Sequence, residues 1–543
     1  MVSTFSGLET ARRALSANQS ALMTVGHNIA NANTEGYSRQ RVNFTQTEAF
    51  PSPAFNKPGI PGQMGTGVKA GEVQRVRESF LDIQYREENH KNGYWGARLD
   101  ALTKMEDIMN EPSDDGISQA MDRFWQSLQD LSVNPEDAGA RSVVRQNGEA
   151  LADTIGTNYS AIQAIQRDYL NEVDVTENKV NSLIRQIDGL NKQIASVEPH
   201  GMLPNDLYDQ RDVLLDELSA YVNIKVDRVP SGGNAKQMAD GKVTVTLANE
   251  NGRALTGADG QPLTLINGTD LTYEQISMNT VPSESDELED PLYSISIGGE
   301  EIRLSEFSSP GKLFGIAEAY GIYTGAADNP ASAAAADIRG IYPDMLRELD
   351  MMVSQFAKAL NDVHNSNASL SEIDSGENQD IDFFGTGSDV RFANLGDGEY
   401  FVGAAKNFRV SDEVRSSLDN IAASSFDGGQ AFAGDGSGAL ALANVKDARL
   451  NFGGSTTNVQ SFYQSVIGEM AVETSEAGRL ERNTASLRES VENRRHSVSS
   501  VSLDEEMSLM IQFQHSYNAA ARSLTNMDDI LDRVINGMGR VGL

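Results

Sequence analysis

Apolar residues recur every seven positions at both ends of the chain. Near the N-terminus the repeat is carried by Leu8, Leu15, Leu22 and Ile29, with Ala11, Val25 and Ala32 at the alternate seam positions. Near the C-terminus two such series run three residues out of step, namely Met510, Tyr517, Leu524, Leu531 and Met538, and Phe513, Ala520, Met527, Val534 and Val541. A narrow seam with a period of seven is typical of coiled coils. The matched repeats predict two terminal helices that pair with each other; two ordinary core helices on separate domains are the alternative.

The interior contains four further stretches in which apolar residues alternate spacings of three and four. They cover residues 117–131, 162–197, 346–363 and 466–501. This spacing predicts amphipathic helices, and the second stretch predicts a helix of about 36 residues, roughly 54 Å long. Because these segments lie far apart in the sequence, we expect an elongated antiparallel bundle with other material inserted between its helices.

Two segments between the bundle helices have a different pattern. Residues 226–310 contain short alternating runs bounded by Gly, Asn and Pro, which predict β-hairpins. Residues 371–445 are rich in Gly, Asp, Ser and Ala and predict an appendage of uncertain fold. The expected fold class is therefore mainly α with β-rich insertions. The expected parts are a terminal coiled-coil layer with an extended turn segment (1–75 and 500–543), a helical bundle (76–225, 311–370 and 446–499), and the inserts 226–310 and 371–445.

Charge is distributed unevenly along the 543 residues. The formal net charge is −34, yet residues 1–50 hold four arginines against three glutamates, and residues 494–543 hold five arginines against six acids. Like-charged surfaces resist close packing whereas near-neutral ones tolerate it, so we expect the ends to be packing surfaces and the middle to be solvated. The acidity argues against nucleic acid as a partner, and no run of about 18 apolar residues predicts membrane insertion.

The sequence lacks the usual signatures of catalysis. It contains no cysteine, and no two of its six histidines lie within five residues of each other, which excludes thiolate sites and paired-histidine metal faces. Neither a GxSxG elbow nor a GxxxxGK[ST] phosphate loop occurs. We therefore expect no enzymatic activity, no cofactor and no metal site.

Two segments carry the residues of a recognisable signature. The first reads His27-Asn-Ile-Ala-Asn-Ala-Asn-Thr-Glu-Gly-Tyr-Ser-Arg-Gln40, and Gly65-Thr-Gly-Val68 continues it. The second reads Ser502-Leu-Asp-Glu-Glu-Met-Ser-Leu-Met-Ile-Gln-Phe-Gln-His-Ser-Tyr517. Both resemble the signatures of bacterial flagellar rod, hook and hook-associated proteins, and the ending Tyr37-Ser-Arg-Gln40 is most similar to the hook-associated proteins of the hook–filament junction.

The first signature also has a local physical interpretation. Asn and Gly tolerate left-handed backbone, so Asn31 and Gly36 predict a sharp end to the first helix. The turn is expected to present Tyr37 and Arg39 as exposed interface anchors, because Tyr and Arg are enriched at interface hot spots. The candidate assembly residues are Leu8, Leu15, Leu22, Ile29, Asn31, Gly36, Tyr37, Arg39, Met510, Phe513, Tyr517, Leu524, Leu531, Val534 and Met538.

The resemblance implies a structural protein of the junction between hook and filament. It implies that the terminal helices form an inner tube layer with copies of the chain in a ring, while the bundle forms a middle layer and the inserts face outward. The implied partners are the hook protein, a second hook-associated junction protein and a cytosolic export chaperone. The start lacks the layout of a cleaved signal peptide. The resemblance implies type III export and an extracellular location in the flagellum. The alternatives are a sibling axial protein, such as the hook protein or the second junction protein, and a flagellum-anchored surface enzyme or adhesin.

Overall fold

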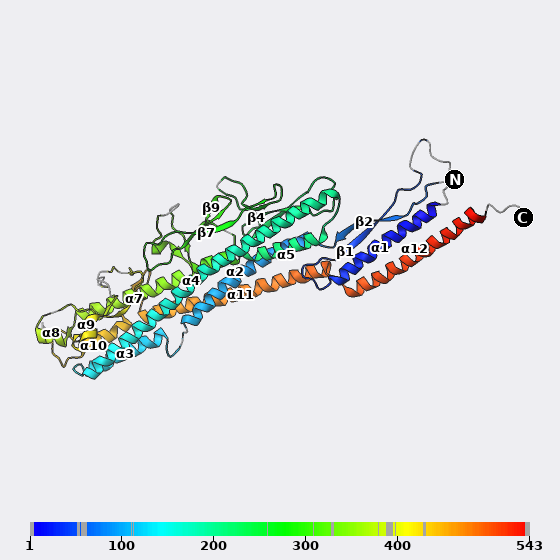
Figure 1. Cartoon of the computed structure of the whole chain (residues 1–543). Helices are drawn as coiled ribbons and strands as arrows, with labels where there is room; N and C mark the ends of the chain where they lie inside the picture. Colours follow the sequence, from blue (N-terminus) through cyan, green and yellow to red (C-terminus); the bar gives the residue numbers. More distant parts are fainter. Residues whose placement is uncertain are drawn as a thin grey trace.

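The protein is a long rod, seen in a computed structural model of the chain (Figure 1). Most of its helices lie roughly along the long axis, and both ends of the chain lie at the same tip. The structure describes residues 5–51, 55, 62–109, 111, 113–257, 259–307, 309–326, 331–377, 379–386, 392, 395–396, 398–426 and 430–537.

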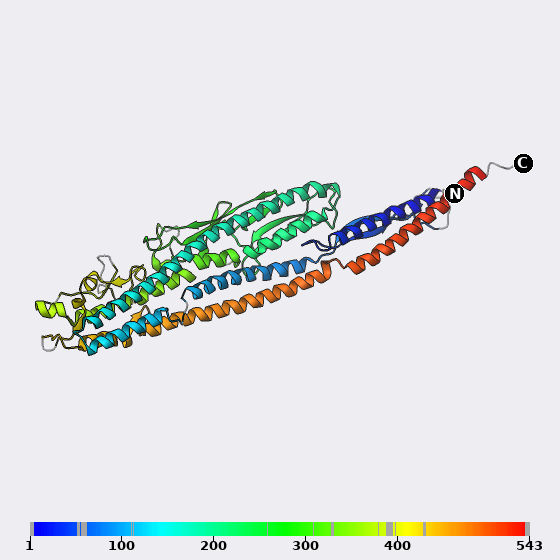
Figure 2. The same cartoon turned by 60° about the horizontal axis from the view of Figure 1, so that its bottom comes forward.

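Four elements form one end of the rod, which we call the terminal module. They are α1 (Phe5–Ala30), β1 (Gln40–Gln46), β2 (Val68–Arg75) and α12 (Leu503–Gly537). α1 and α12 lie side by side and antiparallel (Figures 1 and 2), with Gly7 beside Met527 near one end and Asn28 hydrogen-bonded to Glu506 near the other. β1 and β2 form an antiparallel hairpin. The long terminal helices expected from the heptads are therefore confirmed, and they pair with each other.

The rest of the rod, which we call the body, is built on six long helices. Its spine is α4, which has 60 residues and is therefore about 90 Å long. The sequence pattern predicted only the second part of this helix, because small residues interrupt the apolar positions of the first part; at Gly148 a Cβ atom would lie 3.1 Å from the Phe383 ring. The six helices are α2 (Ser79–Met109), α3 (Ile117–Val133), α4 (Ala138–Val197), α5 (Asn205–Tyr221), α7 (Ile341–Asn365) and α11 (Val459–Ser499).

The sequence pattern missed α2 altogether, although it lies along α11 over much of its length (Figure 2). The first part of its buried face is largely polar, with Asp82, Arg86, Asn89 and His90, so its apolar stripe is confined to the second part of the helix. Part of its packing comes from ion pairs such as Arg98 Nη2 to Glu473 Oε2, at 3.2 Å. A helix held partly by polar pairs gives a weaker periodic hydrophobic signal.

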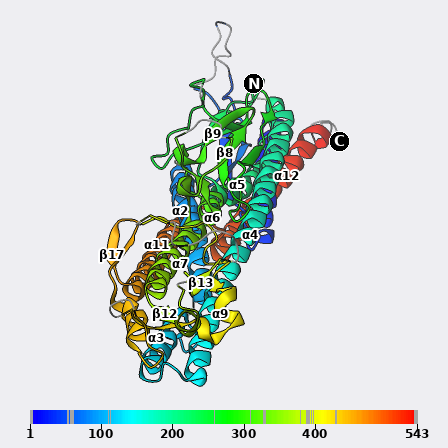
Figure 3. The same ribbon diagram turned by 90° about the vertical axis from the view of Figure 1, so that its left-hand side faces the viewer.

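Two small sheets lie along one side of α4 (Figures 1 and 3). One asparagine of α4 fastens each sheet. Asn191 exchanges two hydrogen bonds with the backbone of Val243, and Asn181 does the same with Ile276. The first sheet has the order β3 (Ile224–Val229), β4 (Lys242–Leu247), β5 (Thr264–Asn267), β6 (Thr272–Tyr273). The second has the order β11 (Ile338–Arg339), β10 (Ile322–Tyr323), β8 (Leu292–Ile297), β7 (Ile276–Thr280), with β9 (Glu300–Arg303) also on β8.

The Gly- and Asp-rich segment folds around the far end of α7. Asn361 donates to the carbonyl of Phe384 and accepts from the N–H groups of Phe383 and Phe384. His364 contacts the Ile381 carbonyl through Nδ1 and accepts from the N–H of Ala422 through Nε2, so it is a neutral imidazole; burial lowers its pKa to about 4. The shorter elements are α6 (Lys312–Tyr320), α8 (Leu370–Ser375), α9 (Asp412–Ser416), α10 (Ser437–Ala443), β12 (Ala368–Ser369), β13 (Phe384–Gly385), β14 (Arg409–Val410), β15 (Ala422–Ser424), β16 (Leu450–Phe452) and β17 (Ser455–Thr457).

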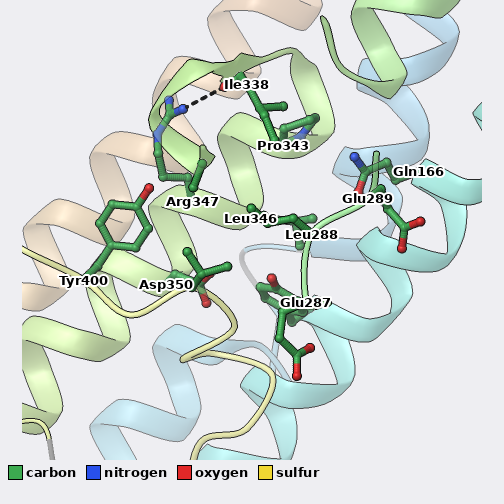
Figure 4. A pocket seen from close by; sticks show the side chains of 13 residues that line it. Gln166, Glu287, Leu288, Glu289, Ile338, Pro343, Leu346, Arg347, Asp350 and Tyr400 are labelled. Atoms are coloured by element: carbon green, nitrogen blue, oxygen red, sulfur yellow. Dashed lines mark hydrogen bonds between the residues drawn. The ribbon is translucent and has the colours of Figure 1, made fainter. Parts of the chain in front are cut away.

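The two inserts meet beside α7 at a cavity of about 20 Å³, which has room for one water molecule (Figure 4). Asp350 of α7 accepts hydrogen bonds from the N–H groups of Gly403 and Ala405, both at 2.8 Å. Glu287 of the first insert lines the same cavity and pairs with Lys406 of the second. Burial raises the pKa of Asp350 to about 7; the two N–H donors oppose this shift, and the charge of Glu287 adds to it.

We expect Asp350→Asn to change how stability depends on pH. An aspartate has a pKa of about 3.9 in the unfolded chain. Because the folded-state value is higher, ionisation of Asp350 penalises the folded state, and the free energy of unfolding should fall as pH rises from about 4 to about 7. The loss is on the order of 2–4 kcal/mol, and the asparagine variant should lack it.

Denaturant unfolding at several pH values between 4 and 8 measures this effect. Asp528→Asn, at an exposed position on α12, controls for the change in net charge. Parallel pH profiles for Asp350→Asn and the unaltered chain would contradict the assignment.

Candidate assembly interface

The seam between α1 and α12 contains the predicted residues of α12. Met510, Phe513, Tyr517, Leu524 and Val534 are half-buried there, and Leu531 is buried. Met538 lies outside the described residues. The seam is narrow, because most of the remaining surface of α12 is exposed.

The seam on α1 agrees with the expected one only in part, because Ala11 and Val25 are buried but the leucine series is not. Leu8, Leu15, Leu22 and Ile29 are only half-buried, whereas the most buried residues are smaller or polar. The reason is that α1 packs against the β1–β2 hairpin as well as α12, so the centre of its buried face is displaced from the leucine series. The hairpin also reaches α12, where the Phe44 and Phe513 rings meet edge to face at 5.9 Å. The buried residues of α1 are Ala11, Ala17, Ala21, Val25 and Asn28.

A hydrogen-bonded cluster joins the two chain ends at the base of the terminal module. Asn28 donates from Nδ2 to the Gln40 carbonyl at 2.8 Å and to Glu506 Oε2 at 3.0 Å. Its Oδ1 accepts from the Tyr37 hydroxyl at 2.8 Å and from the Gln40 N–H at 3.0 Å. Arg39 donates from Nε to Glu506 Oε1 at 2.7 Å. We call Asn28, Tyr37, Arg39, Gln40 and Glu506 the polar knot; it uses both family-like signatures at once.

The polar knot contradicts the expectation that Tyr37 and Arg39 are exposed anchors. Tyr37 is half-buried, and the Arg39 side chain is only 18% exposed between Glu505 and Glu506. Burial raises the pKa of Tyr37, and the nearby carboxylates of Asp206, Asp209 and Glu506 raise it further. Those carboxylates lie far away in the sequence, so a local analysis could not show that the turn faces inward.

The turn from residue 31 to residue 38 sits on α5 of the body. Asn31 ends α1 by donating from Nδ2 to the His27 carbonyl, and its side-chain oxygen accepts from Thr34. Gly36 has a φ of +75°, and a Cβ atom there would overlap Cγ2 of Val213 on α5. Two residues further on, the N–H group of Ser38 donates to the Asp209 carboxylate at 3.1 Å. Gly36 is therefore needed both for its left-handed backbone and for close approach to the body.

The outer surface of the terminal module carries large apolar side chains that are more than half exposed. Several lie on faces of α1 and α12 that do not take part in the seam. They are Phe5, Met23, Met507, Ile511, Ile530 and Ile535. No helix among the described residues is long and apolar enough to cross a membrane, and no group of three or more metal-binding side chains occurs in that part of the chain.

We expect Gly36→Ala to destabilise the protein more than Gly232→Ala. Both glycines have left-handed backbone, with φ values of +75° and +78°, but only Gly36 has a neighbour in the way. Backbone strain should cost about 1 kcal/mol at each site, and the overlap with Val213 should add to it at Gly36.

Val213→Ala in the Gly36→Ala background should recover part of the loss, because it removes the overlapping methyl group. Denaturant unfolding of these three variants and of the unaltered chain measures these differences. Equal losses for the two single glycine variants would refute the close approach.

Three family models match the chain. Residues 102–384 match the helical domain of flagellar hook-associated protein FlgK, residues 8–37 match the flagella basal body rod protein family, and residues 496–537 match the C-terminal family of flagellar basal body rod FlgEFG proteins. The two terminal matches cover α1 with its turn, and α12 with the residues before it.

Individual relatives agree with these matches. The chain is 43% identical over 540 residues to flagellar hook-associated protein 1 of Bacillus subtilis (strain 168), which covers 99% of both chains. It is 27% identical to the protein of that name from Salmonella typhimurium, over 74% of this chain and 63% of the other.

A solved structure shows the same fold at lower sequence identity. It is that of the flagellar hook junction protein FlgK from Burkholderia pseudomallei, with a TM-score of 0.58 and 15% identity, covering 77% of this chain and 100% of that chain. The similarity in sequence to the Bacillus subtilis protein extends over nearly all of this chain. The chain therefore belongs to the flagellar hook-associated protein FlgK family, a family of structural flagellar proteins and not of enzymes.

Proposed function

We propose that the chain forms the junction between hook and filament of the flagellum by axial self-assembly as a ring. The rod-protein family models at both chain ends indicate assembly with other axial proteins of the flagellum. The observation that supports self-assembly is the apolar outer surface of the terminal module. Its seam is already filled by α1, α12 and the hairpin, yet six large apolar side chains stay exposed. Exposed apolar surface of this kind marks a protein interface.

The charge distribution supports the orientation of the subunits. The excess of acid lies between residues 51 and 493, whereas the two ends are close to neutral. Close packing of many copies is least costly where the net charge is smallest. We therefore place the terminal modules at the centre of the ring, the helices of the body around them and the two inserts outermost, outside the cell.

The proposed neighbours are the hook protein on one side and a second hook-associated junction protein on the other. An export chaperone would hold the chain in the cytosol before secretion. The relatives share the name of hook-associated protein, which supports the junction over the sibling roles of the axial family.

We expect Ile511→Asp to abolish assembly without unfolding the monomer. Ile511 is 54% exposed, so the folded monomer loses little packing. In the ring, a carboxylate buried in an apolar contact should cost several kcal/mol, and every subunit contact repeats the cost. Swimming, filament number per cell and secreted filament subunits measure assembly, and thermal melting measures folding.

Ser523→Asp is the matched control, because it adds the same charge at an exposed polar position of α12. It should leave filaments near normal. Normal filaments on cells with Ile511→Asp would sink the proposed outer interface, and would favour a surface protein that is only anchored to the flagellum.

Leu524→Asp tests the inner seam separately. Leu524 is half-buried between α1 and α12, so this variant should loosen the terminal module within the monomer as well as block assembly. The body does not use Leu524, and its cooperative unfolding should be nearly unchanged. Limited proteolysis should then cut α12 faster than in Ile511→Asp, while the body stays protected. Equal protection of α12 in both variants would argue against the seam.

A further inference from the structure

The chain passes between the terminal module and the body only twice. Residues 76–78 join β2 to α2, and residues 500–502 join α11 to α12. Three consecutive residues outside helix or strand leave freedom to pivot at each passage, so the direction of the terminal module depends on the contacts around these passages as well as on the turn that packs on α5.

Arginines lie beside both connecting segments, residues 76–78 and residues 500–502. Arg75 and Arg77 lie at the start of the first passage, and Arg495 lies in the last turns of α11, before the second. Their side chains are 6%, 11% and 14% exposed. Burial of three cations next to two short connections requires anionic partners at the same place.

The partners come mainly from one face of α5. Arg75 pairs with Asp209 at 2.7 Å and Asp212 at 3.0 Å, and it also contacts Asp240. Arg495 pairs with Asp216 at 2.7 Å. The three α5 aspartates are three and four residues apart, which places them along one side of the helix.

Arg77 and Asp82 complete the link between the two passages. Arg77 holds Asp82 of α2 with two parallel hydrogen bonds, at 2.8 and 2.9 Å, and approaches Asp212 at 3.4 Å. Arg495 also reaches Asp82, at 3.1 Å, so one carboxylate holds an arginine from each passage.

Arg86 and Arg211 complete the cluster. Arg86 pairs with Asp216 at 2.7 Å, and Arg211 lies beside Asp212 while donating to the Gly241 carbonyl. Five buried arginines thus face five aspartates, so the buried charges balance. A sixth arginine, the half-exposed Arg228, also pairs with Asp240. Burial by itself raises the pKa of Asp212, but Arg77, Arg75, Arg211 and Arg86 hold it well below its usual range.

We propose that this arginine–aspartate cluster fixes the direction in which the terminal module leaves the body, with Arg77 and Arg495 as its positioning residues. Buried ion pairs add little net stability, because desolvation offsets much of the attraction, but they demand one geometry. An arginine that donates two parallel hydrogen bonds to one carboxylate also fixes the relative orientation of the two side chains. The polar knot supports the module from the turn side, while the cluster holds the two connections themselves.

The inference goes beyond the proposed assembly and can be tested on the monomer. The chain has no native cysteine, so Ser196→Cys on α4 and Ser523→Cys on α12 accept a donor and an acceptor dye at exposed positions. Single-molecule energy transfer then reports the distribution of distances between body and terminal module. We expect one narrow population for the otherwise unaltered chain.

The test variant is Arg77→Gln with Asp82→Asn, which removes both charges and leaves the cluster neutral. We expect its distance distribution to broaden and its mean to shift, while the helical signal and the melting of the body are retained. The matched control is Arg98→Gln with Glu473→Gln, a pair between α2 and α11 within the body, at 3.2 Å. The control should stay as narrow as the parent.

A distribution as narrow as the parent's in the test variant, or equal broadening in the control, would overturn the proposal. If the double variant fails to fold, Arg77→Lys is measured instead. Lysine keeps the positive charge but cannot donate the two parallel hydrogen bonds that Arg77 makes to Asp82. This variant should broaden the distribution relative to the parent, and coincidence with the parent would refute the geometric role of Arg77.

Assembly gives a second and separate readout. If the test variant swims poorly and its distance distribution is broadened, the fixed direction of the terminal module matters for assembly of the ring. Normal swimming together with a broadened distance distribution would support the positioning role of the cluster in the monomer, but would show that assembly does not depend on it. Failure of the self-assembly proposal would appear in Ile511→Asp and leave the monomer measurement intact.

Discussion

Glu506 joins the two ends of the chain, and the arrangement of the terminal module depends on that contact. Its carboxylate is almost completely buried and accepts from Asn28 of α1 and from Arg39 of the following turn. A buried carboxylate must be paired, so α12 can begin only where α1 ends. The register of the antiparallel pair follows from this contact. So does the position of the hairpin, because Gln40 begins β1 while bonding Asn28.

The body depends on different interactions, because its chain runs along the rod several times and these passes must be held together. α4 supplies the length, and its buried asparagines bind the two sheets through paired backbone hydrogen bonds. Asn361 and His364 do the same for the second insert on α7. Each polar side chain replaces a missing strand neighbour, which lets sheets end against a helix without unpaired backbone groups.

Electrostatics acts in opposite ways in the two regions. The solvated body carries the excess negative charge, which keeps single chains apart in solution. At the joint, opposite charges are buried together with no excess, so they contribute geometry more than free energy. The terminal module has little net charge and an apolar exterior. This distribution of charge and apolar surface suits the proposed flagellar junction, in which subunits would pack through their ends.

The sequence by itself determined the terminal helices, the helical body with β-rich inserts, and the family. An apolar repeat with a period of seven indicates that one face of a helix packs against one apolar partner. On α12 the predicted seam is indeed the face that is covered. The tertiary structure determined which partners the polar residues contact and whether those residues are buried. α2, Tyr37 and Arg39 are placed by carboxylates more than a hundred residues away, and α1 turns its alanines inward because it has two partners instead of one. Hydrophobic periodicity cannot register such contacts, since an ion pair or hydrogen bond between distant segments leaves no repeat in either segment.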